Sequence, residues 1–334
     1  MQIWYDALTG KHVRYACALA NTLRLHGHQL LLTSRKHPDT ISVANILKEK
    51  FVFVGEYRPE SLYTRLKTGL ERMQYFTEKF EGNPPELAIS HQSPDLCRVA
   101  FGLGIPIITT ADTPYASAVC KLSVPFSNVL VISSCLPKKY YRSFGCKKIV
   151  TFGGVDEVAW AQKQRPLELN LKRPVIVVRQ LETGAAYATE KTDYTAEIAR
   201  KLSEFGTVIF LRRYQNHIVI TRGRSVACGS KFADSVRLAF SADLLVGVGG
   251  TLAREAALQG TPSIIISTFE KQYVNDYLAE KGFPIFTVAK SEVVRCAKKY
   301  AGQKFDVANK FSSLENPVKV IAGIIAKRKF NQQK

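Results

Sequence analysis

The segment that decides the fold reads Leu244-Leu245-Val246-Gly247-Val248-Gly249-Gly250-Thr251-Leu252-Ala253-Arg254-Glu255. In this segment an uncharged apolar run is followed by glycines and then by a helix-forming run. This order is typical of a buried strand, a tight turn and a helix. Glycines at such a turn let a ligand approach the backbone closely, and free amides at the helix start favour phosphate. A tight turn without a ligand would use the same residues. Gly249, Gly250 and Thr251 are therefore candidate phosphate contacts.

Glu255 lies one turn into this otherwise apolar helix, where a carboxylate needs a partner. Arg254 or a core hydroxyl could satisfy the carboxylate within the protein. A pair of ribose hydroxyls could satisfy it as a bound ligand. Arg254 and Glu255 are therefore candidate substrate-binding residues.

The same alternation of short apolar runs and longer helical segments fills the chain. It is typical of parallel sheets covered on both faces. Strands are expected at 3–5, 30–33, 52–54, 87–90, 106–109, 129–132, 149–151, 175–178, 208–211, 244–246, 263–266 and 284–287. Helices are expected at 12–26, 61–80, 94–103, 114–122, 194–205, 232–239, 252–258, 273–281 and 291–300.

A length of 334 residues corresponds to about two domains. The polar stretch 162–173 separates two similar halves, so we expect one α/β domain at 1–162 and a second at 163–334. Ligands of such sheets bind at the carboxyl ends of the strands, which predicts a cleft between the domains. The last helix, from Pro317, could cross back to the first domain.

Candidate residues of the first domain follow its expected strands. After the first strand, Gly10 frees backbone amides and Lys11 adds positive charge for a phosphate. His12 could act as a base or as a phosphate ligand, or it could simply cap the helix.

Polar residues also follow two later strands of the first domain. His91 and Ser93 are candidate substrate contacts, and Asp95 and Asp112 are candidate catalytic carboxylates. Asp95 could instead cap its helix.

The first strand of the second domain ends at another polar group. Arg179 could clamp a pyrophosphate, with Glu182 and Thr183 beside it as further substrate contacts. An ion pair between Arg179 and Glu182 is the alternative.

The composition of the chain restricts the classes of partner that we expect it to bind. The chain has 47 Lys and Arg against 28 Asp and Glu, a formal net charge of +19, which attracts polyanions. Its seven cysteines include no C-x-x-C pair and no zinc-like spacing, so we expect reduced thiols and no metal site. With no apolar run of about 18 residues and no signal-like N-terminus, a cytoplasmic protein is expected.

Two of these motifs resemble a known group of enzymes. The run from Gly249 to Pro262 looks like the nucleotide-sugar signature of MurG-type N-acetylglucosaminyltransferases and UDP-N-acetylglucosamine 2-epimerases. The loop Thr9-Gly10-Lys11-His12-Val13 resembles the first loop of MurG-type enzymes, with Lys11 in place of a glycine. In that group the residue matching Glu255 holds the ribose of UDP, so the resemblance implies the same contact here.

Nearly the whole chain resembles domain-of-unknown-function family 354, a set of archaeal and bacterial GT-B-like proteins. The matching stretches are 3–6 with 12–13, 90–94, 99–106, 178–179 with 182–185, and 249–251 with 254–255. The resemblance implies a GT-B-like α/β fold: two Rossmann-like, doubly wound parallel-sheet domains with an interdomain cleft.

Three functions stay open. The first is metal-independent sugar transfer from UDP or another nucleoside diphosphate to an unknown acceptor, a lipid-linked one among the alternatives. The second is 2-epimerisation of a nucleotide sugar, and the third is nucleic-acid or nucleotide binding without catalysis. The loop from Ala7 to His12 lacks the Arg-Pro-Glu triplet of the epimerases, which favours the transferase. No cofactor is expected beyond the nucleotide-sugar substrate.

The resemblance to MurG-type enzymes implies an acceptor that could be lipid-linked, so the positive charge is expected to serve a peripheral contact with an anionic membrane at the inner face. The expected patch comprises Lys138-Lys139-Tyr140-Tyr141-Arg142, Lys147-Lys148 and the tail Lys327-Arg328-Lys329. Each basic residue near anionic headgroups contributes about 1 kcal/mol. RNA binding and mere solubility are the two alternatives for the same charges.

Overall fold

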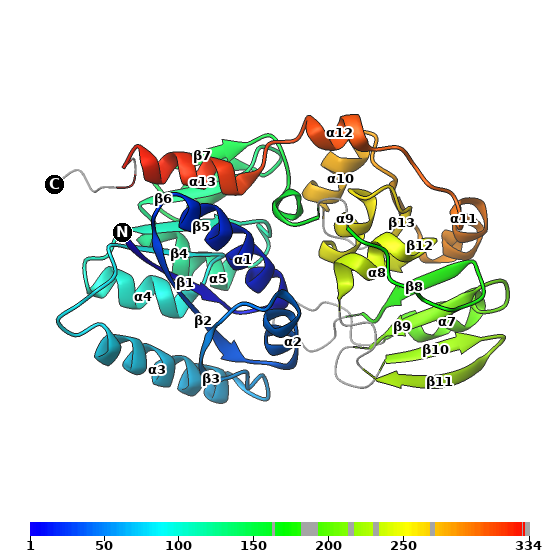
Figure 1. The fold of residues 1–334 in the computed structure, drawn as a ribbon, viewed down its shortest axis with the longest axis horizontal. Coiled ribbons are helices and arrows are strands. Elements are labelled where there is room, and N and C mark those ends of the chain that lie inside the picture. The colour runs from blue at the N-terminus through cyan, green and yellow to red at the C-terminus, as the bar shows by residue number, and fades with distance from the viewer. Residues whose placement is uncertain are drawn as a thin grey trace. The chain divides into compact units, whose positions relative to one another are not determined.

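The computed structural model describes residues 1–161, 164–181, 193–212, 217–229, 234–267, 271–328 and 330. The chain forms two compact units (Figure 1). Unit 1 comprises Met1–Trp160 and Glu315–Lys334, and unit 2 comprises Ala161–Leu314. The expected boundary, between residues 162 and 163, lies close to the first of these divisions. The last helix belongs to unit 1.

Unit 1 is built on one seven-stranded sheet, ordered β3-β2-β1-β4-β5-β6-β7. All of its neighbouring strands pair in parallel. The order reverses between β1 and β4, and ligands of doubly wound sheets bind beside such a switch point. The strands are β1(Gln2–Ala7), β2(Gln29–Lys36), β3(Val52–Glu56), β4(Leu87–Ser90), β5(Ile107–Ala111), β6(Val129–Ser133) and β7(Ile149–Phe152).

Helices cover both faces of this sheet. On one face, Ile3 and Tyr5 of β1 pack in the core that includes α1 and α13. On the other face, Trp4 packs with Phe76 of α3 and residues of α4. The helices are α1(Gly10–Leu25), α2(Pro38–Leu47), α3(Leu62–Lys79), α4(Pro94–Gly102), α5(Ser117–Ser123), α6(Lys138–Arg142) and α13(Pro317–Ala326), with 3-10 turns η1(Val124–Phe126) and η2(Asp156–Ala159).

Unit 2 has a second seven-stranded sheet, ordered β11-β10-β9-β8-β12-β13-β14. The strands are β8(Val175–Arg179), β9(Thr207–Leu211), β10(His217–Thr221), β11(Arg224–Gly229), β12(Leu244–Gly247), β13(Ser263–Ile266) and β14(Ile285–Val288). The helices are α7(Thr195–Leu202), α8(Ser235–Ser241), α9(Thr251–Ala257), α10(Tyr273–Glu280), α11(Val293–Tyr300) and α12(Ala308–Ser312), with the 3-10 turn η3(Lys290–Glu292).

The unit 2 sheet departs from the expected parallel pairing at one edge. Strand β10 pairs antiparallel with both β9 and β11. The turn between β10 and β11 is Arg222-Gly223, with φ of 48° and 75°. Positive φ at both central residues is typical of the two-residue hairpin turn whose twist matches its strands. This hairpin, like α2, α6 and α12, has no counterpart among the elements expected from the sequence.

Several predicted helices begin later than expected. Helix α5 starts at Ser117 rather than at Pro114, and α8 starts at Ser235. The Asp234 side chain accepts a hydrogen bond from the Arg237 amide and so caps α8. Among the described helices, none is both long and apolar enough to cross a membrane.

Candidate functional site

The carboxyl ends of β1, β4 and β5 are neighbours in the unit 1 sheet. Each strand is followed by polar residues: Lys11 and His12 open α1, His91 follows β4, and Asp112 follows β5. A fifth residue, Asp156, opens η2 after β7. These five residues form what we call the His91 cluster.

Lys11 is held by carboxylates. Its Nζ lies 2.5 Å from Asp112 Oδ2 and 2.7 Å from Asp156 Oδ2, and 3.9 Å from Glu157 Oε1. All four side chains are largely buried. We expected Lys11 to supply charge for a phosphate, but these acids balance its charge inside the protein.

His91 links the cluster to the strands beside it. Its Nδ1 lies 2.7 Å from Thr110 Oγ1, and its Nε2 lies 3.2 Å from Asp112 Oδ1. The ligand atoms of His91, Asp112 and Asp156 lie within 4.8 Å of one another, a spacing that suits a metal ion. The Lys11 ammonium already contacts two of these three residues, Asp112 and Asp156. The cluster therefore contains a positive charge supplied by the protein itself.

His12 has a defined hydrogen-bonding state. Its Nδ1 accepts from the Leu8 backbone N–H at 3.3 Å, so the neutral ring carries its proton on Nε2. Its ring centroid lies 4.7 Å from that of His91. Burial, together with His91 and Lys11, holds the pKa of the His12 imidazole well below its usual value. Near neutral pH, His12 is therefore an uncharged donor through Nε2.

Tyr15 of α1 is a residue that the sequence analysis missed. Its hydroxyl is buried and has no hydrogen-bond partner among the described residues, and its ring lies 6.1 Å from the His91 ring. Burial and then the Asp156 charge raise the pKa of this hydroxyl. An unpaired buried hydroxyl beside the His91 cluster is a place for water or for a ligand hydroxyl.

A second polar group lies beneath the same sheet edge. The Arg72 guanidinium donates from Nε to Asp95 Oδ2 at 2.7 Å and from Nη2 to both Asp6 oxygens at 2.7 and 2.8 Å. Its Nη1 donates to the Val54 carbonyl. Ser93 Oγ donates to Asp6 Oδ2 at 2.6 Å. We call Asp6, Arg72, Ser93 and Asp95 the Arg72 network.

Two candidates from the sequence thus have partners within the fold. Ser93 is fully buried and caps α4. Burial raises the pKa of the Asp95 carboxyl, and Arg72 opposes that rise. Gly10 also has a role within the fold, because a Cβ at this position would lie 3.3 Å from Val43 Cγ2 of α2. Its small size is explained by helix packing.

In unit 2 the three glycines of the decisive segment differ in their surroundings. A Cβ at Gly247 would lie 3.5 Å from Arg179 Cβ, and one at Gly250 would collide with the Arg254 guanidinium. At Gly249, which is exposed, a Cβ would meet nothing within 4 Å. The Arg254 guanidinium therefore lies against Gly250, whereas the backbone at Gly249 is open to a ligand.

Glu255 is 1 % exposed, and its Oε2 accepts from Ser235 Oγ of α8 at 3.1 Å. Arg254 is also buried, and its Nη1 lies 3.4 Å from Asn275 Oδ1. A carboxylate accepts up to about four hydrogen bonds, and two hydroxyls of a ribose are among the donors that suit it. A ribose can reach it only if neighbouring side chains move.

The remaining candidates are placed as follows. Arg179 ends β8, beside Gly247. Thr251 is the first residue of α9. Glu182 and Thr183 lie outside the described residues.

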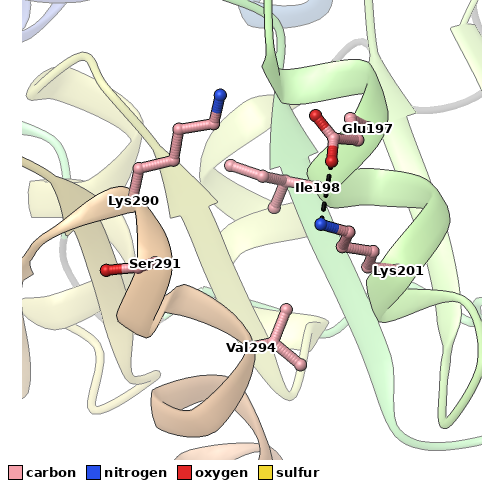
Figure 2. A pocket seen from close by; sticks show the side chains of 6 residues that line it. All are labelled: Glu197, Ile198, Lys201, Lys290, Ser291 and Val294. Carbon is pink, nitrogen blue, oxygen red and sulfur yellow. Dashed lines mark ion pairs between the residues drawn. The ribbon is translucent and has the colours of Figure 1, made fainter.

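A shallow pocket of about 440 Å³ lies in unit 2 between α7 and the η3–α11 segment (Figure 2). Its only acid, Glu197, pairs with Lys201 at 2.8 Å, and both come from α7. The other lining residues are Ile198, Lys290, Ser291 and Val294. No candidate from the sequence lines this pocket.

Comparison with known proteins places the chain in a family of proteins. The model of the family described as "Protein of unknown function (DUF354)" matches residues 1–329. Uncharacterized protein MJ0665 of Methanocaldococcus jannaschii is 27 % identical over 334 residues, which cover 95 % of each chain.

Solved structures match over nearly the full length. The S. aureus MnaA complex with UDP has a TM-score of 0.68 at 10 % identity, covering 98 % of this chain and 96 % of the other. The UDP-GlcNAc 2-epimerase from Neisseria meningitidis bound to UDP-GlcNAc has 0.66 at 12 %, covering 98 % and 100 %. Spinosyn forosaminyltransferase SpnP has 0.57 at 14 %, covering 98 % and 99 %. At such identities the likeness establishes the fold, and the two Rossmann-like domains expected from the sequence are confirmed.

Proposed function

This chain belongs to the DUF354 family, and on that premise we propose that it is an enzyme acting on a nucleotide sugar, best described as a metal-independent glycosyltransferase with a UDP-sugar donor. In this proposal unit 2 binds the nucleotide, and unit 1 supplies the group that receives the acceptor proton. The observation that carries the proposal is the open backbone at Gly249, followed within two helical turns by the buried carboxylate of Glu255. That pairing suits a diphosphate and a ribose.

In the proposed reaction the acceptor oxygen attacks the anomeric carbon, the bond from that carbon to UDP breaks, and the acceptor loses its proton. His12 offers an Nε2–H that holds a substrate oxygen without giving up the Leu8 contact. Asp112 accepts from Lys11, His91 and Thr113. These bonds fix the Asp112 carboxylate, which is the group we propose to receive the acceptor proton.

Nucleotide-sugar 2-epimerisation is the second candidate. Removing and returning a proton at carbon requires an acid and a base close together. In the His91 cluster, the Lys11 ammonium lies within 3 Å of the Asp112 and Asp156 carboxylates. Release of UDP that depends on an added acceptor would favour the transferase. A change of sugar configuration without an acceptor would favour the epimerase.

Nucleotide binding is tested first, by thermal unfolding with UDP, UMP, ADP and UDP-sugars. A ligand at 100 times its dissociation constant adds about 2.7 kcal/mol of stability. We expect Gly249→Ala to abolish the stabilisation by UDP, because the new methyl group occupies the open backbone. The free variant should remain within about 0.5 kcal/mol of the wild type, because nothing lies near the added carbon.

The matched control is Gly323→Ala in α13, which also has open space around its Cβ position. It should keep the full response to UDP. Equal responses in the Gly249 and Gly323 variants would remove Gly249 from the site, and a wild type that responds to none of these nucleotides would overturn the proposed function.

The ribose contact is tested with Glu255→Gln, which keeps the side-chain volume and an acceptor for Ser235. We expect UDP affinity to fall by about 1.5–3 kcal/mol, as for the loss of charged hydrogen bonds. Calorimetry with UDP and 2′-deoxy-UDP separates the ribose from the rest of the nucleotide. The wild type should prefer UDP, and the preference should shrink in the variant. An unchanged preference would remove Glu255 from the ribose site.

A further inference from the structure

Two buried tyrosines of unit 1 have hydroxyls that the fold itself does not use. Tyr15 of α1 and Tyr141 of α6 are both 0 % exposed. Neither hydroxyl has a hydrogen-bond partner in the part of the chain that the structure describes. A buried hydroxyl without a partner costs free energy, and phenylalanine would fill the same space without that cost. The two hydroxyls therefore point to a bound partner.

Tyr15 lies beside the His91 cluster. It follows Lys11 by four residues and His12 by three, so α1 presents these three side chains on one face. The Tyr15 ring lies 6.1 Å from the His91 ring. A group that pairs with the Tyr15 hydroxyl is therefore next to the donor that we assign to His12.

Tyr141 approaches the same cluster from another element. Helix α6 follows β6, and β6 lies between β5 and β7, the strands that precede Asp112 and Asp156. Burial, and then Cys120, Asp112 and Asp156, raise the pKa of the Tyr141 hydroxyl. The burial of Tyr141 also corrects the membrane patch expected from the sequence, because a buried side chain is not available to headgroups. Lys329 of that patch lies outside the described residues.

The charges of the cluster do not favour a phosphate at this place. The Lys11 ammonium is shared by three carboxylates, those of Asp112, Asp156 and Glu157, and a phosphate would be repelled by them. Arg35 also acts on His12, but its Nε donates to the Leu8 carbonyl and its guanidinium lies over the Tyr57 ring. An uncharged hydroxyl suits the site better, because it both donates and accepts hydrogen bonds, as tyrosine hydroxyls do.

We propose that Tyr15 and Tyr141, together with the Nε2–H of His12, bind the hydroxyls of an uncharged polyol or sugar in unit 1. A polyol presents several hydroxyls close together, so one molecule can pair with all three groups. Both tyrosine hydroxyls are enclosed, so the polyol reaches them only when neighbouring side chains move. That this polyol is the acceptor rests on the proposed glycosyl transfer, whereas its binding does not require a nucleotide.

The stability of Tyr15→Phe/Tyr141→Phe tests whether the hydroxyls lack partners in the free protein. Removing a hydroxyl without a partner loses no hydrogen bond, so the variant should unfold at the wild-type temperature or above it. The control is Tyr63→Phe/Tyr75→Phe, at positions 73 and 39 % exposed in α3, a helix on the other face of the sheet. A tyrosine variant that unfolds well below both the wild type and the control would overturn the proposal, because its hydroxyls would already be paired.

Binding is measured by saturation-transfer difference NMR titrations of the full chain, with and without UDP. The probes are methyl glycosides of glucose, galactose and mannose, myo-inositol, and glucose 6-phosphate as the anionic counterpart. We expect a neutral probe to bind. Its affinity should fall about tenfold or more in Tyr15→Phe/Tyr141→Phe, as for the loss of two hydrogen bonds, and stay unchanged in the control. The affinity for UDP, measured by calorimetry, should be equal in all three proteins.

Two binding results would overturn the polyol site. The first is a wild type that binds no neutral probe, including one that binds only glucose 6-phosphate. The second is a neutral probe that binds equally well to the wild type and to Tyr15→Phe/Tyr141→Phe. A wild type that binds a neutral probe through these tyrosines but binds no nucleotide would support the polyol site and overturn the proposed function.

Discussion

Replacing Arg72 by methionine should lower the free energy of unfolding of unit 1 by about 3–5 kcal/mol, the usual result of removing one partner from a buried ion pair. Arg72 is 2 % exposed and Asp6 is 0 % exposed. The variant leaves the Asp6 carboxylate with Ser93 and Thr33 as its hydrogen-bonding partners. It also removes the guanidinium contact from the Asp95 carboxylate. An uncompensated carboxylate in the interior is what makes the loss large.

Urea unfolding followed by tryptophan fluorescence measures this loss in unit 1 alone. The chain has two tryptophans, Trp4 and Trp160, and both lie in unit 1. The control is Arg98→Met, at an exposed position of α4, which should change stability by less than about 0.5 kcal/mol. If Arg72→Met and Arg98→Met unfold at the same urea concentration, the Arg72 network does not stabilise the sheet edge.

The Arg72 network also marks a limit of sequence interpretation. Asp6 and Arg72 are 66 residues apart, and nothing in the local pattern of either residue points to the other. The sequence identified Asp95 correctly as a residue at a helix start after a strand, and then assigned it to catalysis because its partner could not be seen. Local periodicity predicts elements, but ion pairs across elements depend on the three-dimensional arrangement.

Lys11 shows the same limit in the His91 cluster. Its partners Asp112 and Asp156 lie 101 and 145 residues away. A lysine at the start of a helix after a strand is consistent with phosphate binding when its surroundings are unknown. Asp156 had a usable signal, since the pair Asp156-Glu157 follows the last strand of unit 1 and the glycines Gly153-Gly154.

The elements themselves were more predictable than the contacts between them. The apolar strands and the glycine turn before α9 have strong local signals, and the structure has them near the expected positions. The hairpin of β10 and β11 was missed because its turn, Arg222-Gly223, is not one of the common glycine pairs with asparagine or aspartate. Its strands are short, and they pair only at an edge.

The largest expected effect on turnover comes from His12. If its Nε2–H holds a substrate oxygen in the transition state, His12→Ala should reduce turnover by about 10²–10³-fold, the loss seen when one such donor is removed. Binding of the nucleotide to unit 2 should be almost unchanged, which calorimetry with UDP verifies. His12→Gln keeps an N–H donor of similar reach, so it should retain much more activity than the alanine variant.

The glutamine variant separates donation from proton abstraction, because glutamine donates a hydrogen bond but cannot serve as a base. Equal losses in His12→Gln and His12→Ala would make His12 the base, and no loss in either would make it a structural cap for α1. The tautomer provides a readout without substrate: ¹⁵N NMR of the imidazole should find the proton on Nε2 at pH 7, with Nδ1 as the acceptor. A proton on Nδ1, or a cationic ring, would contradict the donor role.

The pH dependence follows from the direction of the His12 pKa shift. Burial, His91 and Lys11 lower this pKa, so the ring should stay neutral in the folded protein as pH falls through about 6.5, the usual histidine value. The unfolded chain takes up that proton first, so this residue should make the fold less stable as pH falls below about 6.5. The contribution of His12 to turnover should therefore persist to a pH below about 6.5. The contradicting result is a fall in wild-type turnover centred at the usual histidine pKa and absent in His12→Gln. Such a fall would show that the ring titrates normally and that its burial does not keep it neutral.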